Sequence, residues 1–223
     1  MTYEKVKESR VADDRKKHCI YLALKRIFDV SAAYILLMIL YVPMLFISIS
    51  IKMTSRGPII FKQVRIGERG RPFVCYKFRT MSTDAPPNMS TAEFADAERY
   101  ITAVGGFLRK TSLDELPQLF NVLGGDMSFV GPRPLIPAEK EVHEKRNELG
   151  VYEARPGITG LAQIMGRDML SDGEKVGYDA KYVSNIRFTS DAKIIFRTVF
   201  KVCSADGIKK RGEKSSEGVA DIR

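Results

Sequence analysis

The chain has 223 residues, 36 of them lysine or arginine and 27 aspartate or glutamate, which gives a net charge of +9. This length provides for one sizeable core, and the basic balance favours phosphate-bearing partners such as a nucleotide, a nucleic acid or an anionic membrane surface. Three widely separated cysteines and only two histidines argue against a zinc site or a disulfide framework.

The chain begins with a basic arm, which is followed by a long hydrophobic segment. Residues 1–17 are polar and basic without periodicity, and we expect a mobile or surface-lying arm over residues 1–24. Val30–Ile51 then contains 22 uncharged residues, and about 20 apolar residues in a helix cross the hydrocarbon core of a bilayer. The sequence therefore predicts a membrane helix over residues 25–52.

Two features favour a helix that enters the membrane and returns. Pro43 interrupts the middle of the segment and invites a bend. Cations flank both ends, with Lys25 and Arg26 before the segment and Lys52 and Arg56 after it. Because cationic flanks prefer the cytoplasmic side, we expect a re-entrant hairpin that breaks at Pro43. A straight single span and a buried soluble helix are the alternatives.

A β-hairpin is predicted next. Ile59–Ile66 and Pro72–Phe78 are short β-prone runs that a glycine-bounded turn connects. The period of two places Lys77 and Arg79 on the same face. These two cations form either a phosphate clamp or a solvated strand edge.

Adjacent carboxylates, Asp114 and Glu115, form the centre of the chain's most informative stretch. Hydrophobic spacing predicts a short helix over Asp114–Leu123, whose positive end would favour an ionised aspartate. Ser112 and Glu115 also fit a capping box, which is a purely structural alternative, but Pro117 suits a helix that starts at Asp114 better. The face expected to be buried comprises Leu116, Leu119, Phe120 and Leu123.

Three further arginines are candidates for binding phosphate. Arg109 closely precedes the carboxylates. Arg133 lies between two prolines, which hold its backbone extended, and Arg155 heads a rigid glycine-bearing loop. Arg133 could equally belong to a surface connector, and a glycine-bearing loop such as that of Arg155 is weak evidence for an anion site without a Walker or dinucleotide spacing.

The last part of the chain predicts helices and a tail. Residues 137–149 are expected to form a charged, mostly solvent-facing helix, and residues 173–186 form another. Ala192–Cys203 combines an apolar side with Lys193, Arg197 and Lys201, a pattern typical of a helix in a membrane interface or against a core. Residues 204–223 are polar and expected to be disordered.

Six motifs occur in order between Lys25 and Gly160, and as a set they are highly specific; the resemblance that they carry covers about Lys25 to Phe200. They resemble the small monotopic phosphoglycosyl transferases, also called bacterial or initiating sugar transferases. The motifs are Lys25-Arg26-x-Phe28-Asp29, Ser55-Arg56-Gly57-Pro58, Tyr76-Lys77-Phe78-Arg79-Thr80-Met81, Leu108-Arg109-Lys110-Thr111-Ser112-Leu113-Asp114-Glu115-Leu116-Pro117-Gln118, Val130-Gly131-Pro132-Arg133-Pro134 and Arg155-Pro156-Gly157-Ile158-Thr159-Gly160. The relatives usually carry Ser-Pro where this chain carries Val42-Pro43.

The resemblance implies an enzyme that transfers a sugar 1-phosphate from a nucleotide sugar, usually a uridine one, to polyprenyl phosphate. Asp114 would attack the β-phosphate, forming a covalent intermediate, and would ligate Mg²⁺ with support from Glu115. The residues implied to bind the substrate are Lys77, Arg79, Arg109, Arg133 and Arg155.

The expected fold is α+β: a mostly helical monotopic membrane domain with a re-entrant helix, a small β-hairpin and interfacial amphipathic helices. Its parts would be the arm (1–24), the membrane helix (25–52), a catalytic domain (53–203) and the tail (204–223). The resemblance implies the cytoplasmic face of a bacterial inner membrane, allows a homodimer and involves no nucleic acid. The alternative is a membrane-tethered basic scaffold or nucleic-acid-binding module.

Overall fold

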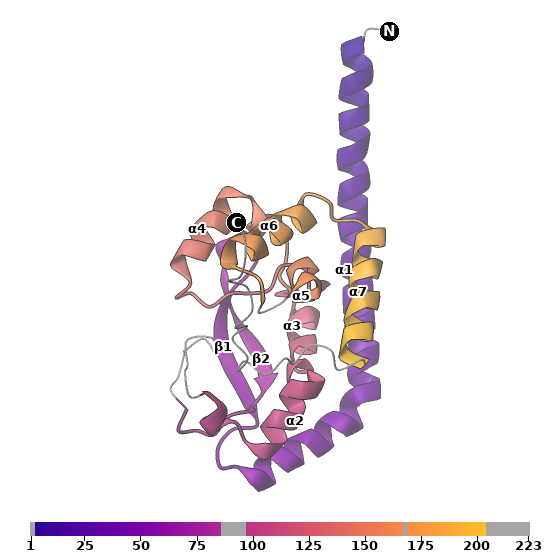
Figure 1. The fold of residues 1–223 in the computed structure, drawn as a ribbon. Coiled ribbons are helices and arrows are strands. Elements are labelled where there is room, and N and C mark those ends of the chain that lie inside the picture. Colours follow the sequence, from indigo (N-terminus) through magenta and orange to yellow (C-terminus); the bar gives the residue numbers. More distant parts are fainter. Residues whose placement is uncertain (1–2, 86–96, 167–168, 204–223) are drawn as a thin grey trace, which may run out of the picture.

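The computed structural model describes residues 3–85, 97–166 and 169–203, so the expected tail at 204–223 lies outside the described residues. The fold is α+β and mostly helical, as predicted. One long helix stands beside a domain of shorter helices and two small sheets (Figure 1).

The long helix α1 (Tyr3–Thr54) includes both the basic arm and the hydrophobic segment without a break in helical structure. Pro43 lies inside it, and the helix bends toward its C-terminal end, where it passes beneath the domain (Figure 1). Among the described residues, Ile20–Thr54 is the one stretch that is long and apolar enough to cross a membrane. Most of its large apolar side chains are exposed.

The predicted hairpin is present. Strands β1 (Ile60–Ile66) and β2 (Pro72–Phe78) pair antiparallel, with Ile60 opposite Phe78. The turn between them contains Arg69 and Gly70, both at positive φ, a backbone region that glycine adopts at little steric cost.

A second sheet was not predicted from the sequence. Strands β3 (Ser128–Val130) and β4 (Gly157–Thr159) pair parallel, and each has three residues. Three residues are too few to show an alternating pattern, so the same stretches read as proline- and glycine-bearing loops. The pairing brings the segment after β3, which carries Arg133, next to the Arg155 loop.

The remaining α-helices pack around these sheets and α1. They are α2 (Ala103–Thr111), α3 (Gln118–Gly124), α4 (Lys140–Glu148), α5 (Leu161–Met165), α6 (Asp172–Val183) and α7 (Phe188–Cys203). One core cluster joins Ala33 and Leu37 of α1 to Leu119 and Val122 of α3. Phe120, expected on the buried face of α3, is 52% exposed.

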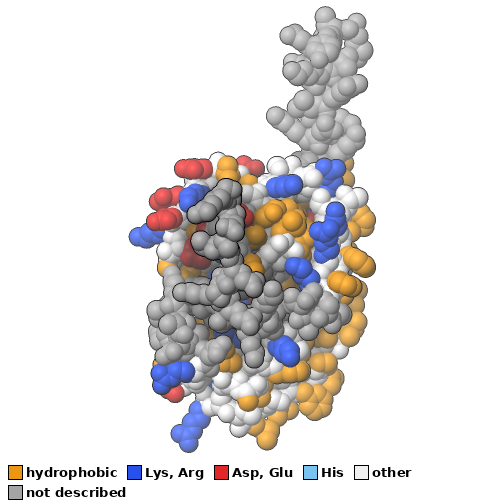
Figure 2. Space-filling model, in the orientation of Figure 1, with side chains coloured by type: hydrophobic (Ala, Val, Ile, Leu, Met, Phe, Trp, Pro, Cys, Tyr) orange, Lys and Arg blue, Asp and Glu red, His pale blue; other side chains and the backbone are white. Residues whose placement is uncertain are grey.

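Helix α7 meets α1 at its first turn, where Asp191 accepts hydrogen bonds from Tyr21 and Lys25. Its apolar side is divided between core and surface. Ile194 is buried, whereas Phe196 and Phe200 are 74% and 66% exposed. Figure 2 shows lysine and arginine side chains among apolar ones on the visible face of the molecule. Packing against the core therefore explains only part of the apolar side of α7.

Candidate active site

The two central carboxylates lie in a 3₁₀ turn, Leu113–Glu115, between α2 and α3. The helix expected to start at Asp114 starts at Gln118, directly after Pro117. The prediction of a helical N-terminus at Asp114 and Glu115 was therefore wrong. Pro117, which has no N–H, occupies the N-cap position of α3, and so the preceding residues form a separate turn.

The capping-box alternative is also wrong at this position. Ser112 adopts a left-handed conformation with φ 57°, and its amide donates to the carbonyl of Arg109 at the end of α2. Its side chain makes no cap hydrogen bond. The Glu115 carboxylate is directed to Lys77 instead.

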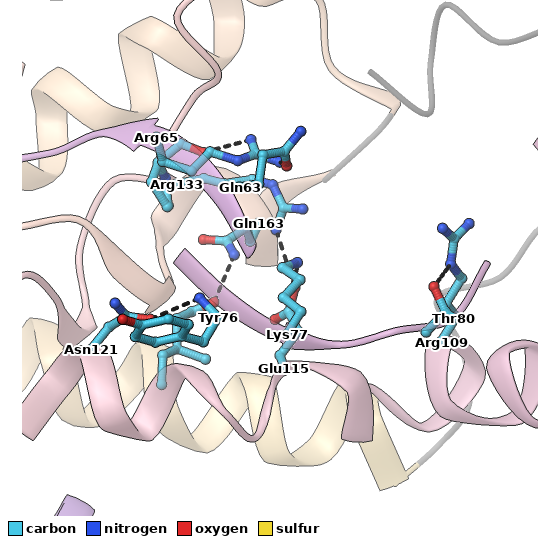
Figure 3. Close-up of polar contacts among 12 residues, drawn as sticks. Gln63, Arg65, Tyr76, Lys77, Thr80, Arg109, Glu115, Asn121, Arg133 and Gln163 are labelled. Atoms are coloured by element: carbon cyan, nitrogen blue, oxygen red, sulfur yellow. Dashed lines mark hydrogen bonds and ion pairs between the residues drawn. The ribbon is translucent and has the colours of Figure 1, made fainter. Parts of the chain in front are cut away.

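Glu115 joins three separate elements of the fold (Figure 3). Its Oε1 atom accepts a hydrogen bond from Lys77 Nζ of β2 at 2.7 Å. The same oxygen lies 3.7 Å from Nη1 of Arg133, which follows β3. The side chains of Lys77 and Glu115 are 20% and 13% exposed, and that of Arg133 is 41% exposed. Residues that are far apart in sequence thus form one half-buried cluster with a cation open to solvent.

Opposing effects act on the pKa of Asp114. Burial raises its pKa above the ordinary aspartate value, and the adjacent Glu115 raises it further. Lys77, Arg109 and the residue's own backbone N–H oppose this shift without cancelling it. The ionised form of Asp114 therefore depends on the cations around it rather than on a helix dipole.

Arg109, in the last turn of α2, is oriented by Thr80. Its Nε atom donates to the Thr80 hydroxyl at 2.8 Å, and the rest of the guanidinium extends away from Thr80 (Figure 3). The close approach of α2 requires a glycine, because a Cβ atom on Gly105 would lie 1.9 Å from the Thr80 carbonyl oxygen. The segment that follows β2 and helix α2 together fix the direction of Arg109.

The other two predicted cations have partners away from Glu115. Arg79 is 6% exposed, and its guanidinium donates to the carbonyl oxygens of Ser55 and Arg56 at the end of α1. Arg155 lies with Nε 3.5 Å from a carboxylate oxygen of Glu68, in the hairpin turn. The structure therefore groups Lys77 and Arg133 around Glu115, and Lys77 and Arg109 act electrostatically on Asp114.

Sequence reasoning missed Asn121, which fixes β2 against α3. This side chain is 1% exposed. Its Oδ1 accepts from the Tyr76 amide at 3.0 Å, and its Nδ2 donates to the Val74 carbonyl at 2.7 Å. Asn121 thus satisfies the outer edge of β2 as a neighbouring strand would, one residue from Lys77. A single asparagine within a helix carries no recognisable signal for this role.

The carboxylates of Asp114 and Glu115 fit a magnesium site in which a substrate would supply further ligands. Among the described residues, no three histidine, cysteine, aspartate or glutamate side chains are grouped so that they could hold a metal ion by themselves. Mg²⁺ is commonly bound through one or two carboxylates, with water and substrate phosphates supplying the other oxygens. Asp114 and Glu115 provide carboxylates of this kind beside cations suited to phosphate.

Comparison with known proteins identifies relatives along most of the chain. A family model described as "Bacterial sugar transferase" matches residues 20–205. The chain is 42% identical over 200 residues to the "Uncharacterized sugar transferase EpsL" of Bacillus subtilis, covering 88% of this chain and 95% of that protein.

Two longer relatives carry names that state an activity. One is the "UDP-glucose:undecaprenyl-phosphate glucose-1-phosphate transferase" of Klebsiella pneumoniae, 41% identical over 82% of this chain. The other is the "Undecaprenyl-phosphate galactose phosphotransferase" of Salmonella typhimurium, 39% identical over 82% of this chain. The matched regions span 40% and 41% of those two proteins.

Proposed function

The chain belongs to the bacterial sugar transferase family, and we propose that it transfers a sugar 1-phosphate from a nucleotide diphosphate sugar to polyprenyl phosphate. The relatives named for an activity use undecaprenyl phosphate as acceptor, and one is named for UDP-glucose. A uridine diphosphate sugar and a polyprenyl phosphate are therefore the proposed substrates. The product would be the first lipid-linked sugar of a bacterial glycan.

The proposed reaction has two displacements at one phosphorus atom. A carboxylate oxygen of Asp114 forms a bond to the β-phosphorus, and the bond between this phosphorus and the bridging oxygen breaks, releasing the nucleoside monophosphate. An oxygen of the lipid phosphate then attacks the same phosphorus, and the bond to Asp114 breaks. Covalent catalysis of this kind divides one difficult displacement into two easier ones and requires an ionised nucleophile.

The cations around the acidic turn would bind the diphosphate. Lys77 and Arg133 already converge on Glu115, and Arg109 extends from the adjacent helix. Their charges also favour the ionised form of Asp114, which burial opposes. Arg155, whose side chain is 37% exposed, can exchange Glu68 for a phosphate, whereas Arg79 contributes its charge from a buried position.

We propose that Asp114 would ligate a magnesium ion, with Glu115 supporting the site. Such an ion would neutralise part of the negative charge of the diphosphate when bound. Glu115 holds Lys77 at the turn and so keeps a cation beside Asp114.

Contacts of the domain with both ends of the apolar segment of α1 support a re-entrant arrangement on the cytoplasmic face. Near the start of the apolar segment, Arg26 donates to the carbonyl oxygens of Val122 and Leu123. Beyond its other end, Arg79 binds the backbone of Ser55 and Arg56. A helix that crossed the bilayer would place these two ends on opposite sides, where one domain could not contact both. The exposed aromatic residues of α7 would lie in the same membrane interface.

The observation that carries the proposed function is the convergence of Lys77 and Arg133 on the Asp114–Glu115 turn, beside a helix with exposed apolar side chains. The test is incubation with a panel of nucleotide sugars and polyprenyl phosphate, with measurement of nucleoside monophosphate. We expect release with at least one uridine diphosphate sugar. Tight, salt-sensitive binding of RNA or DNA without any sugar transfer would support the scaffold alternative instead.

A further inference from the structure

The segment that carries Arg133 is fixed by hydrogen bonds to its carbonyl oxygens. Bonds of this kind come from three different elements, β1, β4 and α6. The Val130 carbonyl accepts from the Tyr182 hydroxyl, and the Pro132 carbonyl accepts from the Gly157 amide. The Pro134 carbonyl accepts from the Arg65 guanidinium, and the Leu135 carbonyl accepts from the Ile66 amide. We call residues 130–135 the Arg133 segment. Its backbone is therefore constrained on either side of the residue that approaches Glu115.

The carbonyl oxygen of Arg133 itself is bound by a buried arginine. Arg146 of α4 donates to it from Nη1 at 2.8 Å. The other terminal nitrogen of Arg146 donates to the carboxylate of Asp179 in α6. Arg146 is 3% exposed and Asp179 is 1% exposed. The predicted charged, mostly solvent-facing helix is confirmed in α4, and Arg146 is the residue of this helix that is buried.

The chemistry of arginine explains why this contact is directional. The guanidinium is a planar group with five donors in fixed positions, so it can bind two acceptors at once. A buried carboxylate requires a partner, and Asp179 finds one in Arg146. Because Asp179 holds one side of the guanidinium, the other side is fixed toward the Arg133 carbonyl.

We propose that Arg146, oriented by Asp179, is a positioning residue that holds the Arg133 segment where the Arg133 side chain reaches Glu115. The role in catalysis rests on the proposed function, in which Arg133 binds the substrate diphosphate. Neither Arg146 nor Asp179 contacts the substrate in this proposal. Their effect passes through the backbone of Arg133.

The test uses a double variant, Arg146→Met with Asp179→Leu. Replacing a buried ion pair by apolar side chains leaves no uncompensated charge, so the fold is retained. The Arg133 carbonyl nevertheless loses its donor. Lys145→Met is the matched control, because Lys145 is the preceding residue of α4 and is exposed.

The first measurement is hydrogen–deuterium exchange of a peptide covering residues 128–136. We expect exchange about tenfold faster in the double variant, because a constraint on this segment is lost, and no change in Lys145→Met. Exchange as slow as in the native protein would overturn the proposal. This readout does not require enzymatic activity, so it decides the positioning role even if the proposed function fails.

The second measurement is steady-state release of nucleoside monophosphate. In the double variant we expect KM for the nucleotide sugar to rise about tenfold with kcat within about twofold, because a misplaced Arg133 binds the diphosphate less well. In an Arg133→Ala background the same double change should have no further effect on KM. An equal loss in both backgrounds would indicate general damage to the fold and would overturn the proposal.

Discussion

Lys77 Nζ and Glu115 Oε1 lie 2.7 Å apart, which fixes strand β2 to the acidic turn that carries Asp114. The ion pair is largely buried, and both members change the pKa of Asp114, in opposite directions. Lys77 favours the charged aspartate and Glu115 disfavours it. The pair thus sets how readily the proposed nucleophile ionises.

Asp114→Asn is expected to abolish turnover and to stabilise the protein near neutral pH. Turnover should fall by about 10⁴-fold or more, because the amide cannot replace the nucleophilic carboxylate. Folding raises the pKa of Asp114, so the associated stability is present below the unfolded pKa and is lost as pH rises through the folded pKa. The variant should therefore unfold at a higher temperature than the native protein at pH 7.

Thermal unfolding of both proteins with a chelator present checks this prediction. The difference in unfolding temperature should shrink as pH falls through the folded pKa of Asp114, because the native carboxyl group then becomes protonated. A variant less stable than the native protein at pH 7 would contradict the sign, and near-normal turnover would remove the covalent role.

Substitutions in the Lys77–Glu115 pair should shift the pH profile in opposite directions. Glu115→Gln removes a charge that raises the pKa of Asp114, so the acidic limb of kcat/KM moves to lower pH. Lys77→Met removes a charge that lowers this pKa, so the acidic limb moves to higher pH. Both variants should also lose activity, but the position of the limb is read from the shape of the profile. Shifts of the same sign would show that the limb does not report Asp114.

Asn121→Leu should destabilise the fold by about 2 kcal/mol, because the Tyr76 amide and the Val74 carbonyl lose their partner. Thermal unfolding at constant pH measures this effect. The control is Asn185→Ala, whose side chain is exposed and accepts from Arg187, and which should change stability by less than about 0.5 kcal/mol. Equal effects of the two substitutions would argue against the edge-capping role of Asn121.

Topology can be tested with cysteines at the two ends of the apolar segment. In a background where Cys19, Cys75 and Cys203 are replaced, Ile20→Cys and Met53→Cys present thiols at positions that are 50% and 81% exposed. A membrane-impermeant maleimide applied to inside-out vesicles should label both, and applied to right-side-out vesicles should label neither. Labelling of the two positions from opposite sides would establish a spanning helix.

The spacing of residues along the sequence predicted the elements whose side chains interact mainly with sequence neighbours. The hairpin followed from two short β-prone runs and the glycine-bounded turn between them. Ser171 and Glu174 form a capping box from the same Ser-x-x-Glu spacing that occurs at Ser112 and Glu115. At Glu115 the box is absent because the carboxylate accepts a hydrogen bond from Lys77, 38 residues earlier in the chain.

Roles that depend on distant partners could not be predicted in this way. The spacing of two placed Lys77 and Arg79 on the same face. Arg79 instead donates to backbone carbonyl oxygens just after the end of α1, and this contact depends on how α1 packs against the domain. The charged composition of α4 indicated a solvated helix, and nothing in it distinguishes Arg146 from its exposed neighbours. The motifs identified the acidic turn and its cations. The residues that support them, such as Asn121, Arg146 and Asp179, were identified only from the structure.

The most direct test of the account is the mass of the protein during turnover without the acceptor. Native protein incubated with a nucleotide sugar that supports activity, and without polyprenyl phosphate, should gain the mass of one sugar phosphate. Peptide mapping should place this mass on Asp114, and the Asp114→Asn variant should show no gain. Nucleoside monophosphate release from native protein with no added mass, or with the mass on another residue, would contradict the covalent role of Asp114.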